Sequence, residues 1–421
     1  MFQSTNGLLR KMSNLGDNIL PGRNGYLRYV FSYLCNNMKD TIEIRVGGKV
    51  LSRVVAGPDI TGAAALLDGF QRVWMVYDAN VAQHAAKLAA VLEQESSAGA
   101  AHGPQTGVAS AGAAPSPQTK ALSTNPTSRL VASRAISVSE DSKTMATVLE
   151  LEQWLLDTGA DRDALLLAVG GGITTDMAGF AAAIYKRGIR FAFIPTTLLA
   201  QVDAAIGGKT GVNFESYKNM IGAIRQPEFT YICPDVLRTL PARDFRSGAA
   251  EMLKTFIIED GGNYEKAVRL LSAIYAEGTL TAHRTELQQL IAAAAAVKAG
   301  VVSRDQFENG ERRKLNLGHT FAHAIEWKAR QSGSDITHGE AVAIGMIQAA
   351  KLTDAALAAK LKADFTKAGL PTELPFPLED LTAAMLKDKK AEGGKVHFVL
   401  IRAIGDVYIE DMTVADAAAK L

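Results

Sequence analysis

Residues 164–195 read ALLLAVGGGITTDMAGFAAAIYKRGIRFAFIP. The apolar run ALLLAV before the glycines is typical of a strand that is buried on both faces of a parallel sheet. The next segment, TDMAGFAAAIYKR, predicts a helix with Thr174 or Thr175 as its N-cap and Gly188 at its end. IRFAFIP then predicts another strand. Strand, glycine turn, helix and strand form a βαβ unit, so this stretch predicts an α/β fold with a mostly parallel sheet.

The rest of the chain divides into segments of different character. We interpret Met38, which begins the alternating strand pattern MKDTIEIRV, as the natural start, and residues 1–37 as an N-terminal extension; an ordered extension that packs on the body is the alternative. Residues 38–242 predict the α/β domain, with an Ala-, Gly-, Ser- and Pro-rich insertion at 95–133 that we expect to lack fixed structure. Residues 243–421 predict a mainly helical domain, whose tail KVHFVLIRAIGDVYIE indicates a hairpin.

Composition excludes several classes of protein. The chain has 421 residues, of which 48% are hydrophobic, so it can form large cores. A net charge of +1 gives no electrostatic reason to expect nucleic acid as a partner. No apolar run approaches the length of a transmembrane helix. The two cysteines, Cys35 and Cys233, supply neither a disulfide framework nor a cysteine zinc site, which favours a reducing, cytoplasmic setting.

Histidines are concentrated in one part of the chain. His319 and His323 are four residues apart in a helical pattern, which places them on one face at roughly 5–6 Å. Zinc enzymes use this spacing, and His338 follows closely, so the pattern predicts a metal site; histidines hydrogen-bonded in a polar interior are the alternative. Three carboxylates could complete the site: Glu251, Glu326 and Glu340.

Two glycine-rich segments suit anionic groups. In GGGITTD, glycines allow close approach of a phosphate to a helix N-terminus, although a tight turn without a ligand explains the pattern equally well. Residues 197–223, TLLAQVDAAIGGKTGVNFESYKNMIGA, predict a loop for ligand binding, with a solvated surface loop as the alternative. If the cationic residues in and beside these motifs converge, they suit a substrate with several negative charges: Arg187, Lys209, Lys218, Lys254, Lys298, Arg312, Lys389 and Lys390.

Taken in order along the chain, these motifs resemble the 3-dehydroquinate synthase family of sugar-phosphate cyclases. The resemblance covers most of residues 40–410 apart from the insertion. The segments that carry it are GGGITTDMAGFAAAIYKRGIRFAFIPTTLLAQVDAAIGGKTGVN, KNMIGA, LRTLPARDFRSGAAEMLK, NGERRKLNLGHTFAHAIE and HGEAVAIGM. A series of this length in one order is far more specific than any single motif.

The resemblance implies a lyase of the shikimate pathway, which leads to the aromatic amino acids. The substrate, a small phosphorylated sugar acid, would be 3-deoxy-D-arabino-heptulosonate 7-phosphate, and the products 3-dehydroquinate and phosphate. Family members use NAD catalytically and a divalent metal, above all zinc and also cobalt. Transient oxidation of a substrate hydroxyl by NAD precedes phosphate elimination, return of the hydride and an intramolecular aldol closure. The resemblance also implies a homodimer.

By match to the family's motifs, the resemblance assigns roles to individual residues. The metal ligands would be Glu251, His319 and His338, and His323 would line the site without binding metal. The substrate would contact Arg187, Lys209, Asn219, Lys254, Lys298, Arg312, Asn316, His323 and one of Lys389 or Lys390. NAD would contact Asp78, Asn80, Glu140, Lys143, Gly171, Gly172, Ile173, Asp176, Thr196, Thr197, Asp203 and Lys218.

The chain departs from the family's pattern on the NAD side. Thr175 stands where members commonly carry glycine, Ala204 and Ala205 replace two serines, and Ser139 replaces a glycine. Other interpretations also stay open. The chain could be another sugar-phosphate cyclase, a metal-dependent polyol or alcohol dehydrogenase of the same architecture, or a relative that binds ligand without turnover.

Overall fold

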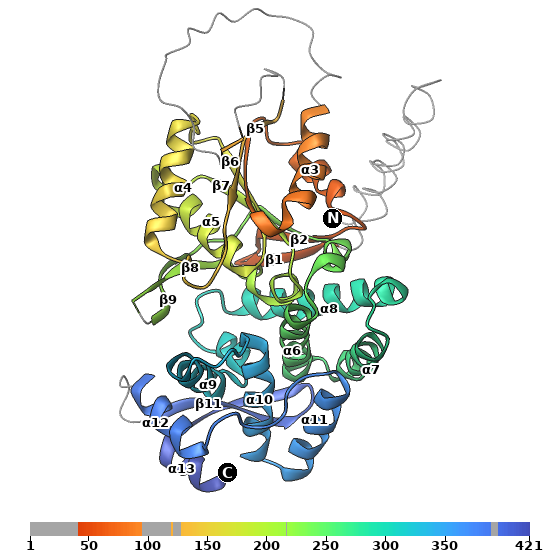
Figure 1. Cartoon of the computed structure of the whole chain (residues 1–421), viewed down its shortest axis with the longest axis vertical. Coiled ribbons are helices and arrows are strands. Elements are labelled where there is room, and N and C mark those ends of the chain that lie inside the picture. The colour runs from red at the N-terminus through yellow and green to blue at the C-terminus, as the bar shows by residue number, and fades with distance from the viewer. Residues whose placement is uncertain (1–40, 95–118, 121–127, 216, 389–394) are drawn as a thin grey trace, which may run out of the picture. The chain divides into compact units, whose positions relative to one another are not determined.

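The computed structural model describes residues 41–94, 119–120, 128–215, 217–388 and 395–421 (Figure 1). An eight-stranded sheet has the order β1-β2-β10-β7-β6-β3-β5-β4. β1 pairs antiparallel with β2 and β4 with β5, whereas the strands between them pair in parallel. The predicted fold class is therefore confirmed. The strands are β1 (Ile42–Val46), β2 (Lys49–Ala56), β3 (Val73–Asp78), β4 (Thr119–Lys120), β5 (Leu130–Ile136), β6 (Leu165–Gly170), β7 (Arg190–Pro195) and β10 (Phe229–Ile232).

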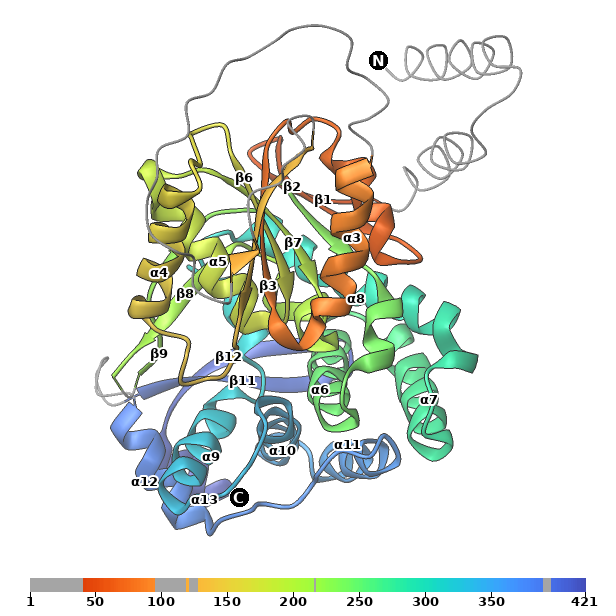
Figure 2. The same ribbon diagram turned by 45° about the horizontal axis from the view of Figure 1, so that its top comes forward.

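Helices cover both faces of this sheet. α3 (Ala82–Gln94) lies on one face, and α4 (Met145–Asp157) and α5 (Gly172–Ile184) lie on the other (Figure 2). Successive residues of one strand point to opposite faces. Val73 and Met75 thus belong to the core on the α3 side, and Trp74 packs in the core on the α4 and α5 side. This two-sided burial explains why the central strands read as continuous apolar runs.

The turn after β6 differs in detail from the prediction. Gly171 is the N-cap of α5, which begins at Gly172, so the predicted cap at Thr174 or Thr175 is wrong. Both threonines lie inside the helix and are buried, because β6 continues to Gly170 and the chain turns into the helix at once. The predicted stop holds, since Gly188 adopts a φ of 113° just after the short helix η4 (Tyr185–Arg187).

Two predicted loops contain regular structure. Within 197–223, a π-helical turn at Ala200–Ala204 is followed by a hairpin of β8 (Lys209–Phe214) and β9 (Tyr217–Ile224), so the loop prediction is wrong there. The C-terminal end of the predicted insertion is also wrong, because residues 130–133 belong to β5. The rest of that insertion lies outside the described residues, except for the short strand β4 and residues 128–129.

The chain after residue 241 is mainly helical, as predicted. Its helices are α6 (Ala242–Glu259), α7 (Gly261–Glu277), α8 (Arg284–Arg304), α9 (His319–Ser332), α10 (His338–Lys351), α11 (Ala355–Lys367), α12 (Leu378–Asp388) and α13 (Val414–Lys420). The predicted tail hairpin is confirmed as β11 (Lys395–Ala403) and β12 (Asp406–Thr413). Short 3₁₀ segments are η1 (Ile60–Leu67), η2 (Ala79–Val81), η6 (Pro234–Thr239), η7 (Thr281–His283) and η8 (Glu311–Asn316).

One apolar core joins the sheet to these helices. Val54 of β2, Leu253 of α6 and Ile291 of α8 belong to the same buried cluster, and Thr41–Leu421 packs as one unit. The predicted domain boundary between residues 242 and 243 stays a prediction, since Thr41–Leu421 forms one compact unit. Residues 1–37 and Met38 lie outside the described part of the chain. Among the described helices, none combines the length and the apolar character needed to cross a membrane.

Candidate functional site

Three helices bring a carboxylate and two imidazoles together. Glu251 lies in α6, His319 is the first residue of α9, and His338 is the first residue of α10. Oε1 of Glu251 is 3.8 Å from Nε2 of His319 and 3.3 Å from Nε2 of His338. Within the described residues, these three form a group whose ligand atoms all lie within 4.8 Å of one another. Tetrahedral ligands with bonds of about 2.1 Å lie roughly 3.4 Å apart, so the spacing fits a divalent cation.

Hydrogen bonds orient both imidazoles for this role. Nδ1 of His319 lies 3.1 Å from the carbonyl oxygen of Leu317, which can only accept, so Nδ1 carries the proton and Nε2 presents its lone pair. Nδ1 of His338 lies 3.4 Å from Oε1 of Glu326. Glu251 is fully buried, and neither of its oxygens has a hydrogen bond of good geometry from a described residue, although Nζ of Lys254 lies 2.5 Å from Oε2. A buried carboxylate in this state is suited to a metal ion.

Two other candidates have different positions. The ring of His323 packs edge-on against His319, with centroids 5.6 Å apart, and is not in the ligand group, so the pairing suggested by spacing alone is wrong. Glu340 forms a capping box with Thr337 at the start of α10 and accepts from Arg243 Nη2 at 2.8 Å. Glu340 therefore stabilises the helix that carries His338, and is committed to that contact.

Charge balance around the ligands also favours a cation. Burial lowers the pKa of His338, but its close contacts with the carboxylates of Glu251 and Glu326, and the charges of both, outweigh burial and raise this pKa to about 10. For His319, burial first, and then the Lys254 charge, holds the pKa well below its usual value. The carboxylates of Glu251 and Glu326 thus stabilise a positive charge between them. Without a metal ion, a proton on His338 supplies this charge, and a bound divalent ion would supply it instead.

Three predicted substrate residues gather beside this group. Nζ of Lys254 donates to Oδ2 of Asp203 at 3.1 Å, and Nζ of Lys298 donates to Oδ1 and to the carbonyl oxygen of the same residue. Arg312 is buried and donates to the carbonyl oxygen of Gly207 at 3.0 Å. Burial would raise the pKa of Asp203, but Lys254 and Lys298 outweigh it and hold this pKa well below its usual value. Three of the eight cations considered in the sequence, Lys254, Lys298 and Arg312, therefore lie close together, around a carboxylate expected on the NAD side.

Lys209 and Asn316 meet a residue that sequence reasoning missed. Both donate to the carboxylate of Glu308, Asn316 through Nδ2 to Oε1 at 2.9 Å and Lys209 to Oε2. Burial first, and then the charges of Arg312 and Lys298, lower the pKa of Lys209 to about 8. Glu308 directly precedes the motif NGERRKLN, and nothing in the local sequence singles it out, because its contact depends on a left-handed backbone and on a lysine from another element.

Other predicted substrate residues are not brought into this cluster. Arg187 is exposed and lies beyond the end of α5, roughly 20 Å along the helix from the glycine turn at 1.5 Å per residue. Among the described contacts, none joins Arg187 to Lys209, Lys254, Lys298 or Arg312. Lys389 and Lys390 lie outside the described residues.

The predicted NAD residues lie at the carboxyl ends of the parallel strands. β3 leads through α3 to β5 on one side, and β6 leads through α5 to β7 on the other, so the strand order reverses between β3 and β6. Ligands of open α/β sheets bind outside such a point. Asp78 ends β3, Asn80 follows in η2, and Gly171 and Gly172 follow β6. Beside them, Thr196 and Thr197 follow β7, and Ile173 and Asp176 lie in the first turns of α5.

The glycine turn has the close packing that a phosphate cradle needs. A Cβ at Gly171 would lie 3.0 Å from Cγ2 of Thr197, and one at Gly172 would lie 3.1 Å from Cβ of Ala204. The N-cap Gly171 makes no side-chain cap, so backbone N–H groups of the first turn stay available for an anion. Thr175 fits without strain, since its hydroxyl donates to the carbonyl oxygen of Gly172 at 2.9 Å inside the helix.

A polar network links this turn to the metal ligands. Lys143 Nζ donates to Asp176 at 2.6 Å and to the side chain of Asn219, a predicted substrate residue. The side chain of Asn213 donates to Glu140 at 2.8 Å. Lys218 donates to Glu326 at 2.8 Å, and Glu326 in turn contacts His338. The β8–β9 hairpin therefore connects the predicted NAD and metal residues.

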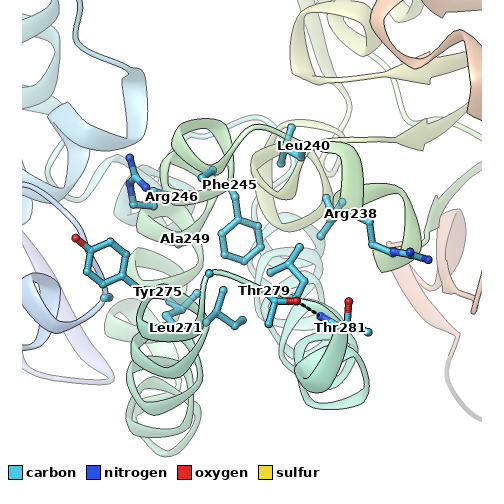
Figure 3. Close-up of a pocket in the computed structure, with 15 residues that line it drawn as sticks. Arg238, Leu240, Phe245, Arg246, Ala249, Leu271, Tyr275, Thr279 and Thr281 are labelled. Carbon is cyan, nitrogen blue, oxygen red and sulfur yellow. Dashed lines mark hydrogen bonds between the residues drawn. The ribbon is translucent and has the colours of Figure 1, made fainter.

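A separate cavity of about 430 Å³ lies between α6, α7 and η6 (Figure 3). Leu240, Phe245, Leu271 and Tyr275 are among its lining residues. None of the predicted site residues lines it, so the candidate site is defined by the side-chain groups described above.

Comparison with known proteins identifies the family. The family model described as 3-dehydroquinate synthase N-terminal matches residues 133–247, and the one described as 3-dehydroquinate synthase C-terminal matches 248–391. The chain belongs to the 3-dehydroquinate synthase family. Among the relatives are the 3-dehydroquinate synthases of Acidithiobacillus ferrooxidans, 43% identical over 65% of this chain and 75% of that protein, and of Synechocystis, 43% identical over 69% and 81%.

A solved structure of a related enzyme has a similar fold. The 2-epi-5-epi-valiolone synthase of Streptomyces hygroscopicus, whose structure has NAD⁺ and Zn²⁺ bound, is 28% identical. It superposes with a TM-score of 0.71 over 88% of this chain and 96% of its own. The departures at Ala204 and at Thr175 therefore occur within a fold that the family shares.

Proposed function

We propose that this chain converts 3-deoxy-D-arabino-heptulosonate 7-phosphate to 3-dehydroquinate and phosphate, with NAD and a divalent metal as cofactors. One observation carries the proposal: the ligand group Glu251, His319 and His338 touches a cluster of buried cations, through the 2.5 Å contact of Glu251 with Lys254. A metal site beside several cations suits a hydroxylated acid phosphate. Membership of the family supports the same reaction.

Cofactors and side chains would divide the chemistry. Glu251, His319 and His338 would hold the metal ion, which would supply Lewis-acid polarisation of substrate hydroxyls, and NAD would supply the acceptor and donor of a hydride. Lys254, Lys298 and Arg312 are proposed to bind the carboxylate and hydroxyls of the substrate. Lys209 and Asn219, with Arg187 and one of Lys389 or Lys390, are proposed for the phosphate. Asp203 holds two lysines in position, so that the cations face the substrate from a preorganised, largely dehydrated site.

His323 and Asn316 complete the proposed substrate contacts. Both are exposed beside the ligand group, as a ligand-facing residue must be before substrate binds. The predicted NAD contacts listed above are proposals on the same footing. Eight of the twelve are supported by their position at the carboxyl ends of β3, β6 and β7: Asp78, Asn80, Gly171, Gly172, Ile173, Asp176, Thr196 and Thr197.

Phosphate release tests the reaction. Purified protein would be given the heptulosonate phosphate with catalytic NAD, with and without a chelator, while absorbance of free NADH is followed. We expect metal-dependent phosphate release without NADH accumulation. NADH accumulation would instead indicate an alcohol dehydrogenase. Bound metal and NAD without phosphate release would exclude 3-dehydroquinate synthesis and direct the search to other sugar phosphates, the substrates of a sister cyclase.

We also infer a homodimer in the cytoplasm. Exposed apolar side chains gather on neighbouring elements, and include Leu149 and Leu156 of α4, Phe214 and Tyr217 at the hairpin end, and Met220. Patches of this kind mark protein interfaces. Light scattering on the purified protein would give the mass of a dimer, and Leu156→Glu would shift it toward the monomer. The cytoplasmic setting rests on the low cysteine content, with Cys233 buried and free.

A further inference from the structure

Each cation of the site has an internal acceptor, and one acceptor differs from the others. Asp203 serves Lys254 and Lys298 from within a buried π-helical turn, and Glu251 is fully buried in α6. Glu308 serves Lys209 and Asn316 from the connection between α8 and η8, and its side chain is 22% exposed. The side chain of Asp203 is nearly as exposed, at 18%, but its donors Lys254 and Lys298 are buried, whereas Lys209 and Asn316 are exposed. Glu308 is therefore the acceptor whose donors an arriving ligand can reach.

Hydrogen bonds within the connection that carries Glu308 hold its side chain toward Lys209 and Asn316. The Asp305 carboxylate accepts from the backbone N–H groups of Asn309, Gly310 and Arg312 at 2.8–3.0 Å. Arg312 also donates to the carbonyl oxygen of Gln306 at 2.6 Å. Within this frame, Glu308 adopts a φ of 61°, a left-handed conformation that side-chain-bearing residues rarely take. A strained residue held by its surroundings points to a role for its side chain.

The two donors on Glu308 are both exposed residues assigned to the substrate. Lys209 and Asn316 offer an N–H⁺ and an amide N–H, the groups that bind phosphate oxygens. The carboxylate of Glu308 thus occupies the place of an anion. An arriving anion must displace this carboxylate, and a phosphate with two negative charges attracts the Lys209 ammonium more strongly than a single charge does.

We propose that Glu308 is an internal competitor: its carboxylate fills the anion position between Lys209 and Asn316 until the phosphate of the substrate displaces it. This inference rests on the proposed function for the identity of the natural ligand, but the anion position itself does not. The carboxylate keeps Lys209 and Asn316 oriented in the free protein and competes with any anion for that position.

Calorimetric titration with inorganic phosphate tests the proposal, with formate as the singly charged comparison. We expect Glu308→Gln to bind phosphate roughly threefold to tenfold more tightly than the parent, in the range that partly exposed charged pairs give. We expect formate binding to improve by a similar factor, because the cost of displacing the Glu308 carboxylate is the same for every anion that takes its place. Glu311→Gln is the matched control, because Glu311 lies in the adjacent η8 but pairs with Arg304.

A second variant separates the carboxylate from the backbone. Glycine tolerates the left-handed conformation, so Glu308→Gly removes the carboxylate and keeps the connection in place. We expect it to match Glu308→Gln in phosphate binding. Unchanged or weaker phosphate binding in both folded variants would overturn the proposal, because Glu308 would then assist the anion or be irrelevant to it.

The test of Glu308 by phosphate binding does not depend on catalytic turnover. Tighter phosphate binding in the variants, with no activity of the parent on the heptulosonate phosphate, would support Glu308 and reject the proposed function. Activity of the parent, without tighter binding in the variants, would support the function and reject Glu308 as the displaceable anion.

Discussion

Oε1 of Glu251 lies 3.3 Å from Nε2 of His338, although the two residues belong to different helices, α6 and α10. Gly339 makes this approach possible, because a Cβ there would meet the backbone of Ser247 at 2.0 Å. The N–H of Gly339 donates to the hydroxyl of Ser247 at 3.0 Å, which fixes the start of α10 against α6. The metal site therefore depends on a close contact between two helix backbones.

Removing the Glu251 carboxylate should remove the metal. In Glu251→Gln, we expect metal content to fall from near one ion per chain to near zero by elemental analysis. Activity should fall about 100-fold or more, since metal catalysis is worth several kcal/mol and 1.4 kcal/mol is about tenfold. Glu340→Gln is the control, because Glu340 caps α10 without entering the ligand group. Full metal content in Glu251→Gln would contradict the ligand assignment.

The cap of α10 should support metal affinity as well as stability. Thr337→Ala removes the capping hydroxyl one residue before His338, and should cost about 1 kcal/mol of unfolding free energy. Chelator competition should also show weaker metal binding, because the cap orients the first turn that carries the ligand. Thr413→Ala removes a similar cap from α13, and is expected to leave metal affinity unchanged. Equal metal affinity in the two variants would mean that the cap does not position His338.

Substrate binding should weaken above about pH 8 through Lys209. Its pKa is lowered to about 8, first by burial and then by Arg312 and Lys298, while Asp203 and Asp305 oppose the shift. The charged ammonium binds the anion, so kcat/KM should fall as the pH rises through this pKa. Glu308 faces the same ammonium, and its carboxylate favours the charged form.

The variant Lys209→Arg tests whether loss of the Lys209 charge causes the alkaline fall in kcat/KM. Lys209→Arg keeps the charge to much higher pH, so the alkaline fall in kcat/KM should move upward or vanish. The comparison requires pH profiles of both proteins between pH 6 and 10. The same alkaline limb in both would assign it to another group.

The glycine turn should not accept a methyl group. A Cβ at Gly171 would lie 3.0 Å from Thr197, so Gly171→Ala should push the first turn of α5 away from the strand. We expect NAD affinity to fall roughly tenfold, a loss of about 1.4 kcal/mol. Gly69→Ala is the control, because nothing lies within 4 Å of the added Cβ. Fluorescence titration with NADH measures both, and equal affinities would exclude the turn as the NAD site.

Local pattern predicted the strands and helices better than their ends. β6, β7 and α5 follow from apolar runs and glycines that act within a few residues. The prediction of an N-cap at Thr174 or Thr175 was wrong. The preference of N-cap positions for Ser and Thr does not reveal how far the preceding strand extends. The β8–β9 hairpin was missed because its glycines and polar residues resemble a loop, whereas in the fold they allow close backbone contact.

Spacing also misdirected the choice of histidines. His319 and His323 share a helix face, but a shared face does not determine which third side chain approaches it. The resemblance to the family identified Glu251 and His338 as ligands through their motifs. The structure brings both side chains close to His319. Glu308 was found by neither route, because its contact with Lys209 joins two distant segments through an unusual backbone angle.

The sequence by itself determined the α/β pattern, the helical second half, and the supply of histidines, carboxylates and cations, because each depends on residue type and short-range period. Only the tertiary structure decided which of these side chains meet. It placed Glu251 against His338, centred Lys254 and Lys298 on Asp203, and set Glu308 between Lys209 and Asn316. These contacts arise from the packing of α6, α8, α9 and α10 on one another and on the sheet, and helix packing is a long-range property that no local period encodes.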